Sequence, residues 1–223
     1  MIATAEQIAG IGFTSQRTRT RMVCRLMERG IRNEQLLQVL NTVPRHMFVD
    51  EAIASRAYED VALPIGEGQT ISQPYAVARM SEILIDEGPL ERVLEVGTGS
   101  GYQAAVLSQL AVQVFSVERI RSLLDKARLR FRSLQYRNIN TRYSDGGWGW
   151  ASHGPFDGIM VTAAPRSVPE PLLEQLAIGG RMIVPVGEQS KVQSLTIITR
   201  TATGFTTREE SDVNFVPFLS GKS

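Results

Sequence analysis

A mostly apolar stretch that runs directly into three alternating glycines constrains the fold of this chain more than any other feature of its sequence. Residues 93–96 are followed by Gly97, Gly99 and Gly101. Because glycine lacks a Cβ, it allows the backbone to turn sharply and to approach a ligand closely. The N–H groups that open a following helix are free to bind such a ligand. The pattern predicts a strand, a tight loop and a helix in an open α/β sheet, with a nucleotide-like molecule at the loop.

The spacing of these glycines separates one class of cofactor from another. The dinucleotide fingerprint is G-x-G-x-x-G, with glycine or alanine at the sixth position. Here Tyr102 holds the sixth position, so the pattern is G-x-G-x-G, and Glu95 lies two residues before the first glycine. This form resembles the first motif of the S-adenosylmethionine-dependent methyltransferases. Tyr102 argues against the alternative of a nicotinamide-dependent oxidoreductase.

From residue 92 onward, strand patterns alternate with helix patterns, which is typical of a parallel α/β sheet. One helix has an apolar face formed by positions 120, 123, 124, 127, 131 and 134. Two further strands flank Gly204 and indicate an antiparallel hairpin that closes the sheet. The expected strands are 93–96, 112–117, 139–143, 158–161, 182–186, 195–199 and 205–207.

The first 90 residues favour helices and loops. One helix is expected to be capped by Thr14 or Ser15 and to stop at Gly30; a second is closed by Pro44, and a third follows Pro74. Segment 62–74 is too rich in glycine and proline for us to expect regular structure. We therefore expect one domain over 1–223, with an N-terminal helical extension at 1–90 and the α/β core at 91–223.

Composition and charge narrow the possible partners. The 223 residues are 43% hydrophobic and 21% charged, as in an ordinary globular protein. A net charge of +1 lacks the basic excess of a nucleic-acid binder, and the arginines at 17–29 are interpreted as a solvated helix face. No stretch approaches the roughly 18 apolar residues that span a bilayer. We expect a cytoplasmic monomer without nucleic-acid or membrane partners.

Cysteine and histidine are too few to form a metal site. Cys24 is the only cysteine, so no internal disulfide can form, and we expect it to pack as a small apolar residue. The two histidines, His46 and His153, are far apart in the sequence. No metal is therefore expected.

The ends of the predicted strands supply the candidate cofactor residues, because ligands of open α/β sheets bind beyond the carboxyl ends of the strands. Glu95 could accept a hydrogen bond from an amino group of the cofactor, or it could hold the loop. Glu118 ends the second strand, 21 residues after Gly97, where an acidic side chain can bind both ribose hydroxyls. After the third strand, Asp145 can accept from an adenine amino group, and Gly146 lets the backbone approach the ring.

The glycine loop completes this set of candidates, and the fourth strand adds space. The residues expected to bind the cofactor are Glu95, Gly97, Thr98, Gly99, Gly101, Glu118, Asp145 and Gly146. The small residues at 162–164 would leave room for reacting groups, although a tight turn before a helix explains them almost as well.

A second candidate site lies at the start of the third helix. Pro74 sits just inside the helix, so Ser72 or Gln73 is placed as its N-cap. Capping alone would explain Ser72. A hydroxyl beside free N–H groups at a helix N-terminus also suits an anion such as a carboxylate.

These residues, taken together, resemble one family over nearly the whole chain, the protein-L-isoaspartate O-methyltransferases. The glycine loop is shared by many methyltransferases, whereas segments 70–74 and 215–217 are far more specific. Ser144 departs from the Gly-Asp-Gly that the family commonly has after the third strand. The matching motifs are 44–49, 58–60, 63–66, 69–74, 94–103, 117–119, 156–159, 169–172, 179–181, 185–187 and 213–217.

The resemblance implies a doubly wound, mostly parallel Rossmann-like sheet with helices on both faces. It implies transfer of a methyl group from S-adenosyl-L-methionine to the α-carboxylate of an L-isoaspartyl residue in a damaged protein, which leaves S-adenosyl-L-homocysteine. The methyl ester would close to a succinimide whose hydrolysis restores some aspartyl linkage. Ser72 matches the active-site serine of the family, and Thr70, Ile71, Gln73 and Val216 are expected to bind the peptide substrate.

Two alternatives remain at this point. A methyltransferase of the same fold that acts on RNA or a small molecule would keep the glycine loop but would have no use for the Ser72 segment. A protein that binds the cofactor without catalysis is opposed only weakly, by the intact Ser72 segment.

Overall fold

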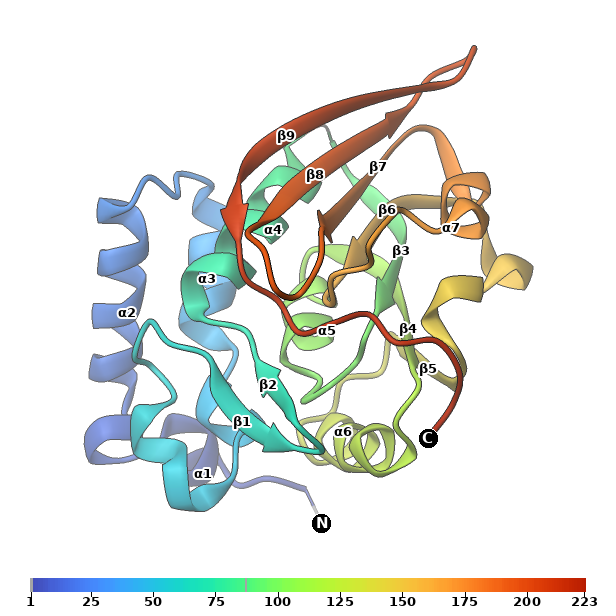
Figure 1. Ribbon diagram of the computed structural model, residues 1–223. Coiled ribbons are helices and arrows are strands. Elements are labelled where there is room, and N and C mark those ends of the chain that lie inside the picture. Colours follow the sequence, from blue (N-terminus) through green and yellow to red (C-terminus); the bar gives the residue numbers. More distant parts are fainter. Residues whose placement is uncertain (1, 87) are drawn as a thin grey trace.

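A seven-stranded mixed sheet forms the centre of the protein, which is described by a computed structural model covering residues 2–86 and 88–223 (Figure 1). The strand order is β5-β4-β3-β6-β7-β8-β9. The first five of these strands are parallel, and β8 runs antiparallel to both β7 and β9. The strands of this sheet are β3 (Leu90–Val96), β4 (Ala111–Glu118), β5 (Ile139–Tyr143), β6 (Phe156–Val161), β7 (Leu176–Val186), β8 (Gln193–Arg200) and β9 (Phe205–Val213).

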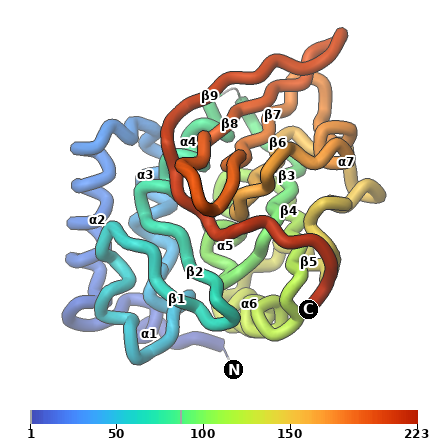
Figure 2. The backbone as a smooth tube through the Cα atoms, in the orientation of Figure 1, coloured from blue at the N-terminus to red at the C-terminus, as the bar shows by residue number. Residues whose placement is uncertain are grey.

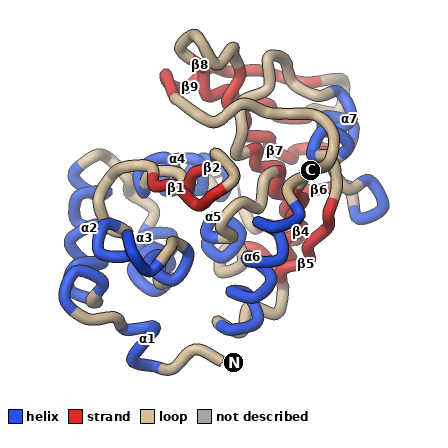
Figure 3. The backbone as a smooth tube through the Cα atoms, turned by 60° about the horizontal axis from the view of Figure 1, so that its bottom comes forward, coloured by secondary structure: helices blue, strands red, loops and turns tan. Residues whose placement is uncertain are grey.

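Alternating side chains along the buried strands create two hydrophobic layers, one on each face of the sheet. Val93, Val114 and Ile183 face the layer that includes residues of α4, α5 and α6, whereas Leu94 and Val96 face the layer that includes α7. The turned view shows these helices on opposite sides of the strands (Figure 3). The sheet is therefore doubly wound, as expected. The helices are α4 (Pro74–Ile85), α5 (Tyr102–Leu107), α6 (Arg121–Ser133) and α7 (Glu170–Glu174).

The N-terminal helices pack against the first of these layers and share its core. Met22 and Leu26 of α2, and Leu36 and Leu40 of α3, are almost fully buried in the same cluster as Val93. Figure 2 shows this first part of the chain along one side of the molecule. The N-terminal elements are α1 (Ala5–Ala9), α2 (Gln16–Glu28), α3 (Glu34–Thr42) and the 3-10 turns Gly12–Thr14, Arg45–Phe48 and Glu51–Arg56.

The segment expected to lack regular structure forms a two-stranded antiparallel hairpin, so that prediction was wrong. Its strands are β1 (Leu63–Gly66) and β2 (Gln69–Ile71). Gly66 and Gly68, which suggested a loop, supply the positive φ angles of 93° and 68° that the tight turn between the strands requires.

Six of the seven strands of the sheet extend beyond their predicted bounds, and β7 and β9 do so the most. The bulge between β6 and β7 accommodates the paired glycines near the start of β7, and the predicted strand began only after them. β9 continues to Val213 through a mainly exposed, polar stretch because its backbone pairs with β8 along its whole length. Both extensions depend on pairing with a neighbouring strand.

Side chains at the helix starts and the lone cysteine differ in part from expectation. Ser15 and Gln73 occupy the N-cap positions of α2 and α4, but neither side chain makes a capping hydrogen bond. Cys24 is exposed, so the expectation that it packs as an apolar residue was wrong. No helix in the described ranges is long and apolar enough to cross a membrane.

The C-terminal tail (residues 214–223) crosses the carboxyl ends of the central strands (Figure 1). A short bridge fixes it to the segment after β6, because Ala164 N donates to Val216 O and Phe218 N donates to Ala164 O. Further along, Ser223 N donates to Arg119 O. The tail thereby spans from the end of β6 to the end of β4.

Candidate active site

The glycine loop after β3 has the tight geometry that its sequence predicts. Gly97, Gly99 and Gly101 have φ angles of 101°, 51° and 89°. A Cβ on Gly97 would lie 2.3 Å from Thr162 Oγ1, and one on Gly101 would lie 2.7 Å from the Phe131 ring. Larger residues are excluded at both positions, because the backbone conformation and the space each forbid a side chain.

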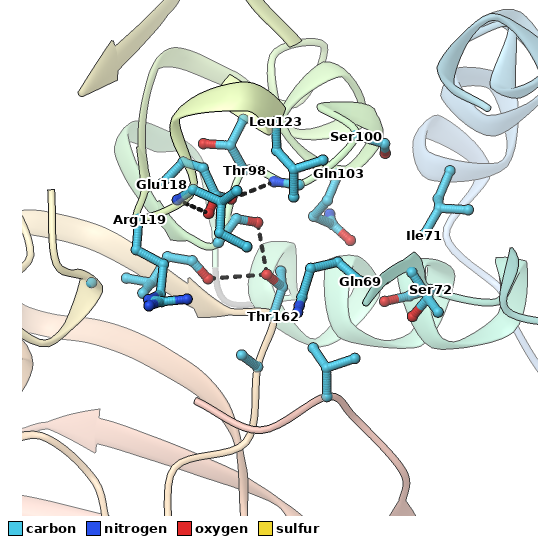
Figure 4. A pocket seen from close by; sticks show the side chains of 18 of the residues that line it. Gln69, Ile71, Ser72, Thr98, Ser100, Gln103, Glu118, Arg119, Leu123 and Thr162 are labelled. Carbon is cyan, nitrogen blue, oxygen red and sulfur yellow. Dashed lines mark hydrogen bonds between the residues drawn. The ribbon is translucent and has the colours of Figure 1, made fainter. Parts of the chain in front are cut away.

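A cavity opens at the carboxyl ends of β3, β4 and β6, beside this loop (Figure 4). In this view Glu118 and Ser72 lie on opposite sides, with Thr162 and Gln69 between them. The cavity brings together residues from both predicted sets. Those that line it are Gly97, Thr98, Gly99, Glu118 and Gly146 from the cofactor set, and Thr70, Ile71, Ser72 and Val216 from the catalytic and substrate sets.

The Glu118 carboxylate is fixed at the end of β4 by two backbone donors. Gly99 N donates to Oε2 at 2.8 Å, and Ile120 N donates to Oε1 at 2.9 Å. Each carboxylate oxygen has a further lone pair for a hydroxyl donor. Glu118 therefore keeps acceptor capacity on both oxygens at the wall of the glycine loop.

Glu95 lies beneath the loop and does not line the cavity. Its side chain is fully buried and is hydrogen-bonded to Ser116, whose hydroxyl lies 2.5 Å from Thr98 Oγ1. Burial, opposed by the Ser116 hydrogen bond and assisted by the negative charge of Glu118, raises the pKa of Glu95 to about 8. Of the two roles considered for Glu95, holding the loop fits this position.

The predicted adenine residues occupy different places. Gly146 lines the cavity, and a Cβ there would lie 2.5 Å from Val96 Cγ1. Asp145 does not line the cavity. Its carboxylate accepts hydrogen bonds from Gly147 N at 2.9 Å and from Gly221 N at 2.5 Å. Ser144 is compatible with this turn, since its N–H donates to Glu118 O.

Ser72 lies between the β hairpin and α4 with its hydroxyl available. Within the described part of the chain, this hydroxyl makes no hydrogen bond, whereas the Ser72 carbonyl accepts from Arg45 Nη2 at 2.7 Å. The N-cap position belongs to Gln73. Ser72 therefore does not cap α4, and capping does not account for its hydroxyl.

A second cavity meets the first at Ser72. It is lined on one side by residues of α4 such as Tyr75 and Arg79, and on the other by 211–216. Gln73, which does not line the first cavity, lines this one. The two cavities share four lining residues, which we call the shared wall: Thr70, Ser72, Thr162 and Val216.

The comparisons with known proteins agree with one another. A family model described as Protein-L-isoaspartate(D-aspartate) O-methyltransferase (PCMT) matches residues 17–223. The chain belongs to this family. It is 57% identical over 215 residues to protein-L-isoaspartate O-methyltransferase 1 of Marinobacter nauticus, which covers 96% of this chain and 97% of the relative. It is 55% identical over 212 residues to the protein-L-isoaspartate O-methyltransferase of Alkalilimnicola ehrlichii, covering 95% and 96%.

Solved structures of protein-L-isoaspartate O-methyltransferases share this fold. One superimposes with a TM-score of 0.82 at 29% identity, over 89% of this chain and 65% of its own. A putative protein-L-isoaspartate O-methyltransferase from Plasmodium falciparum, in complex with S-adenosyl-L-homocysteine, has a TM-score of 0.79 at 25% identity and covers 90% and 98%. Membership of an S-adenosylmethionine-dependent family is consistent with the glycine cradle described above.

Several residues that line the first cavity were not predicted as site residues from the sequence. Ile120, Leu123 and Gln103 line this cavity from the starts of α6 and α5. Phe218 and Leu219 line it from the C-terminal tail. The helix residues could have been found from their positions just after strand ends, but the path of the tail has no local sequence signal.

Proposed function

We propose that this protein transfers the methyl group of S-adenosyl-L-methionine to the free α-carboxylate of L-isoaspartyl residues in proteins. The shared wall is the observation that supports this proposal best. One cavity has the glycine loop and Glu118 expected of a nucleotide-like donor, and the other opens beside an extended segment suited to a peptide. A donor and an acceptor bound in these cavities would meet at Thr70, Ser72, Thr162 and Val216.

The cofactor supplies a methyl group on a positively charged sulfur. We assign Gly97, Thr98, Gly99 and Gly146 to the walls around it and Glu118 to its ribose hydroxyls. Gly101 shapes the loop, because it packs against α6 rather than the cavity. Asp145 keeps its predicted role toward the adenine amino group as part of this proposal, with its remaining lone pairs available beside the tail.

The acceptor requires no general base. A carboxylic acid with an ordinary pKa of about 4 is already ionised at neutral pH, so the nucleophilic oxygen is present before reaction. The site has to align this oxygen with the methyl carbon and the sulfur, and to exclude water. We assign this alignment to the free hydroxyl of Ser72, with Thr70, Ile71, Gln73 and Val216 holding the peptide on either side.

Methylation would begin a repair. The resulting ester carries methoxide, a far better leaving group than the oxide of a carboxylate, so the neighbouring backbone nitrogen can attack the ester carbonyl and close a succinimide ring with loss of methanol. Hydrolysis of the ring yields some normal aspartyl linkage, and the remainder can be methylated again. The substrates would be damaged peptides and proteins, and we propose a cytoplasmic protein that acts as a monomer and as a single domain without nucleic-acid partners.

Two synthetic peptides that differ only in an isoaspartyl or aspartyl linkage test the function. We expect radiolabel from methyl-labelled S-adenosyl-L-methionine to enter the isoaspartyl peptide and the ester to release methanol on standing. Equal labelling of the two peptides, or of neither, would contradict the proposal. Labelling of an RNA or a small molecule instead would support the alternative methyltransferase class.

A further inference from the structure

Arg45 is a buried cation in contact with both halves of the active site. It is fully buried in the 3-10 turn Arg45–Phe48. Its Nε donates to Ala57 O, and its Nη2 donates to Ser72 O, each at 2.7 Å. Its guanidinium carbon lies 4.8 Å from the centre of the Tyr102 ring. Tyr102 directly follows the glycine loop and lines the cofactor cavity, so one side chain joins the acceptor segment to the donor loop.

The energetic setting of Arg45 is unusual for a purely structural residue. No carboxylate of the described residues forms an ion pair with it, and its Nη1 has no hydrogen-bond partner among them. Removing a charge from water is costly unless it is paired and hydrogen-bonded. An apolar side chain could fill this volume more cheaply, which points to a role beyond packing.

We propose that Arg45 is a positioning residue that fixes the Ser72 backbone relative to the cofactor loop and thereby sets the approach of the acceptor carboxylate to the methyl group. This inference rests on the proposed function. The planar guanidinium holds two carbonyl oxygens from different segments in one plane, which a lysine ammonium cannot do. A charge-assisted hydrogen bond to the Ser72 carbonyl also polarises the peptide group that follows it, at the edge of the acceptor cavity.

Arg19 provides a matched control. It is also almost fully buried, so the expectation of a solvated face was wrong for this arginine, and it donates to Tyr58 OH and to the carbonyls of Thr42 and Ile8. It belongs to the same N-terminal part of the molecule but bonds to neither Ser72 nor Tyr102. Arg19→Lys therefore measures the cost of altering a buried arginine that does not hold the active site.

The test compares Arg45→Lys, Arg45→Met and Arg19→Lys, with kcat expressed per site that binds S-adenosyl-L-homocysteine. We expect Arg45→Lys to lower kcat for the isoaspartyl peptide by about 10- to 100-fold, since small misalignments have effects of this size. The Kd values of Arg45→Lys and Arg19→Lys for S-adenosyl-L-homocysteine should stay within about threefold of the wild-type value. This is a smaller change than the loss of one hydrogen bond to a charged group would cause. Arg19→Lys should keep its kcat. If Arg45→Met fails to fold, Arg45→Lys retains the length and charge.

A second comparison places the effect at Ser72. In a Ser72→Ala background, Arg45→Lys should cost less kcat than it does in the wild type, because the group that it positions is gone. Multiplicative losses, or a kcat of Arg45→Lys equal to that of Arg19→Lys, would overturn the inference and leave the proposed function intact. A wild-type protein that labels neither peptide would overturn the proposed function first, and this inference with it.

Discussion

Ser72 and Glu118 occupy opposite sides of one cavity, and their substitutions should separate the two halves of the reaction. Ser72→Ala removes a hydroxyl that no described residue uses, so we expect kcat for the isoaspartyl peptide to fall by about 10- to 100-fold, the value of a hydrogen bond to a charged group. The Kd for S-adenosyl-L-homocysteine, measured by calorimetry, should hardly change. A Ser72→Ala protein that has lost cofactor binding would contradict the role given to Ser72.

Glu118→Gln should show the reverse pattern. The amide can still accept from one backbone N–H, but it lacks the charge that strengthens hydrogen bonds to ribose hydroxyls. We expect a Kd for S-adenosyl-L-homocysteine about tenfold higher, with kcat at saturating cofactor close to wild type. Unchanged cofactor affinity in the same calorimetric titration would exclude the ribose contact.

Glu95 should make stability depend on pH. Its pKa is raised from 4.5 to about 8 in the folded protein. Between these two pH values the folded state therefore holds a proton that the unfolded state has released. The contribution of Glu95 to stability is complete below pH 4.5 and is lost as the pH rises through about 8. Denaturant unfolding between pH 5 and 8 should therefore show a steeper fall in the free energy of unfolding for the wild type than for Glu95→Gln. Parallel pH profiles would show that Glu95 is ionised in the folded protein.

Residue types and spacing predicted much of the site, but not which side-chain atoms already form hydrogen bonds within the protein. Glu118 and Ser72 line the cavity as expected, because strand ends and helix starts leave signals in the local sequence. Glu95 is two residues from Gly97, and the alternation of a strand directs it beneath the loop toward Ser116 on the neighbouring strand. The hydrogen bond between Asp145 and Gly221 joins residues 76 positions apart, and nothing local indicates it.

At the scale of elements, the parallel strands were the most predictable part of the chain. β5 is confirmed with both of its bounds, and the hairpin of β8 and β9 lies where Gly204 indicated a turn. The hairpin of β1 and β2 was missed because glycine and proline disfavour a strand on average, while the pairing of Leu63 with Ile71 stabilises this one. Pairing with a neighbouring strand overrides the local preference in β1, β2, β7 and β9, which were missed or predicted too short.

The C-terminal tail should contribute directly to cofactor affinity. Phe218 and Leu219 line the cofactor cavity, and Gly221 is held by Asp145. Deleting residues 218–223 should raise the Kd for S-adenosyl-L-homocysteine by about tenfold, as expected for losing one partly buried aromatic contact. Trp148→Ala removes an exposed aromatic side chain close to Asp145 but outside the cavity lining, and it should leave the Kd unchanged. Equal effects of the two changes would mean that the tail has no specific contact with the cofactor.

At the scale of the whole molecule, the helical N-terminal part and the α/β core should unfold together. They share one hydrophobic cluster, and the Phe48 ring packs against Tyr102 with centroids 5.6 Å apart. Calorimetry of the full chain should give one transition with equal calorimetric and van't Hoff enthalpies. Residues 91–223 expressed alone should lack a cooperative transition, because removal of residues 1–90 exposes the apolar face around α5. Two separate transitions, or a natively folded fragment, would show two domains.

The path of the tail also has a consequence for the order of events in each catalytic cycle. Residues 216–219 form part of the wall of the first cavity, and Val216 also lines the second. Because the tail is part of the wall around the donor, we expect donor exchange to be coupled to movement of the tail, with a long residence time for the donor and brief encounters with substrates. Such an enzyme keeps its methyl donor bound while it contacts many undamaged proteins, which suits a search for rare isoaspartyl residues.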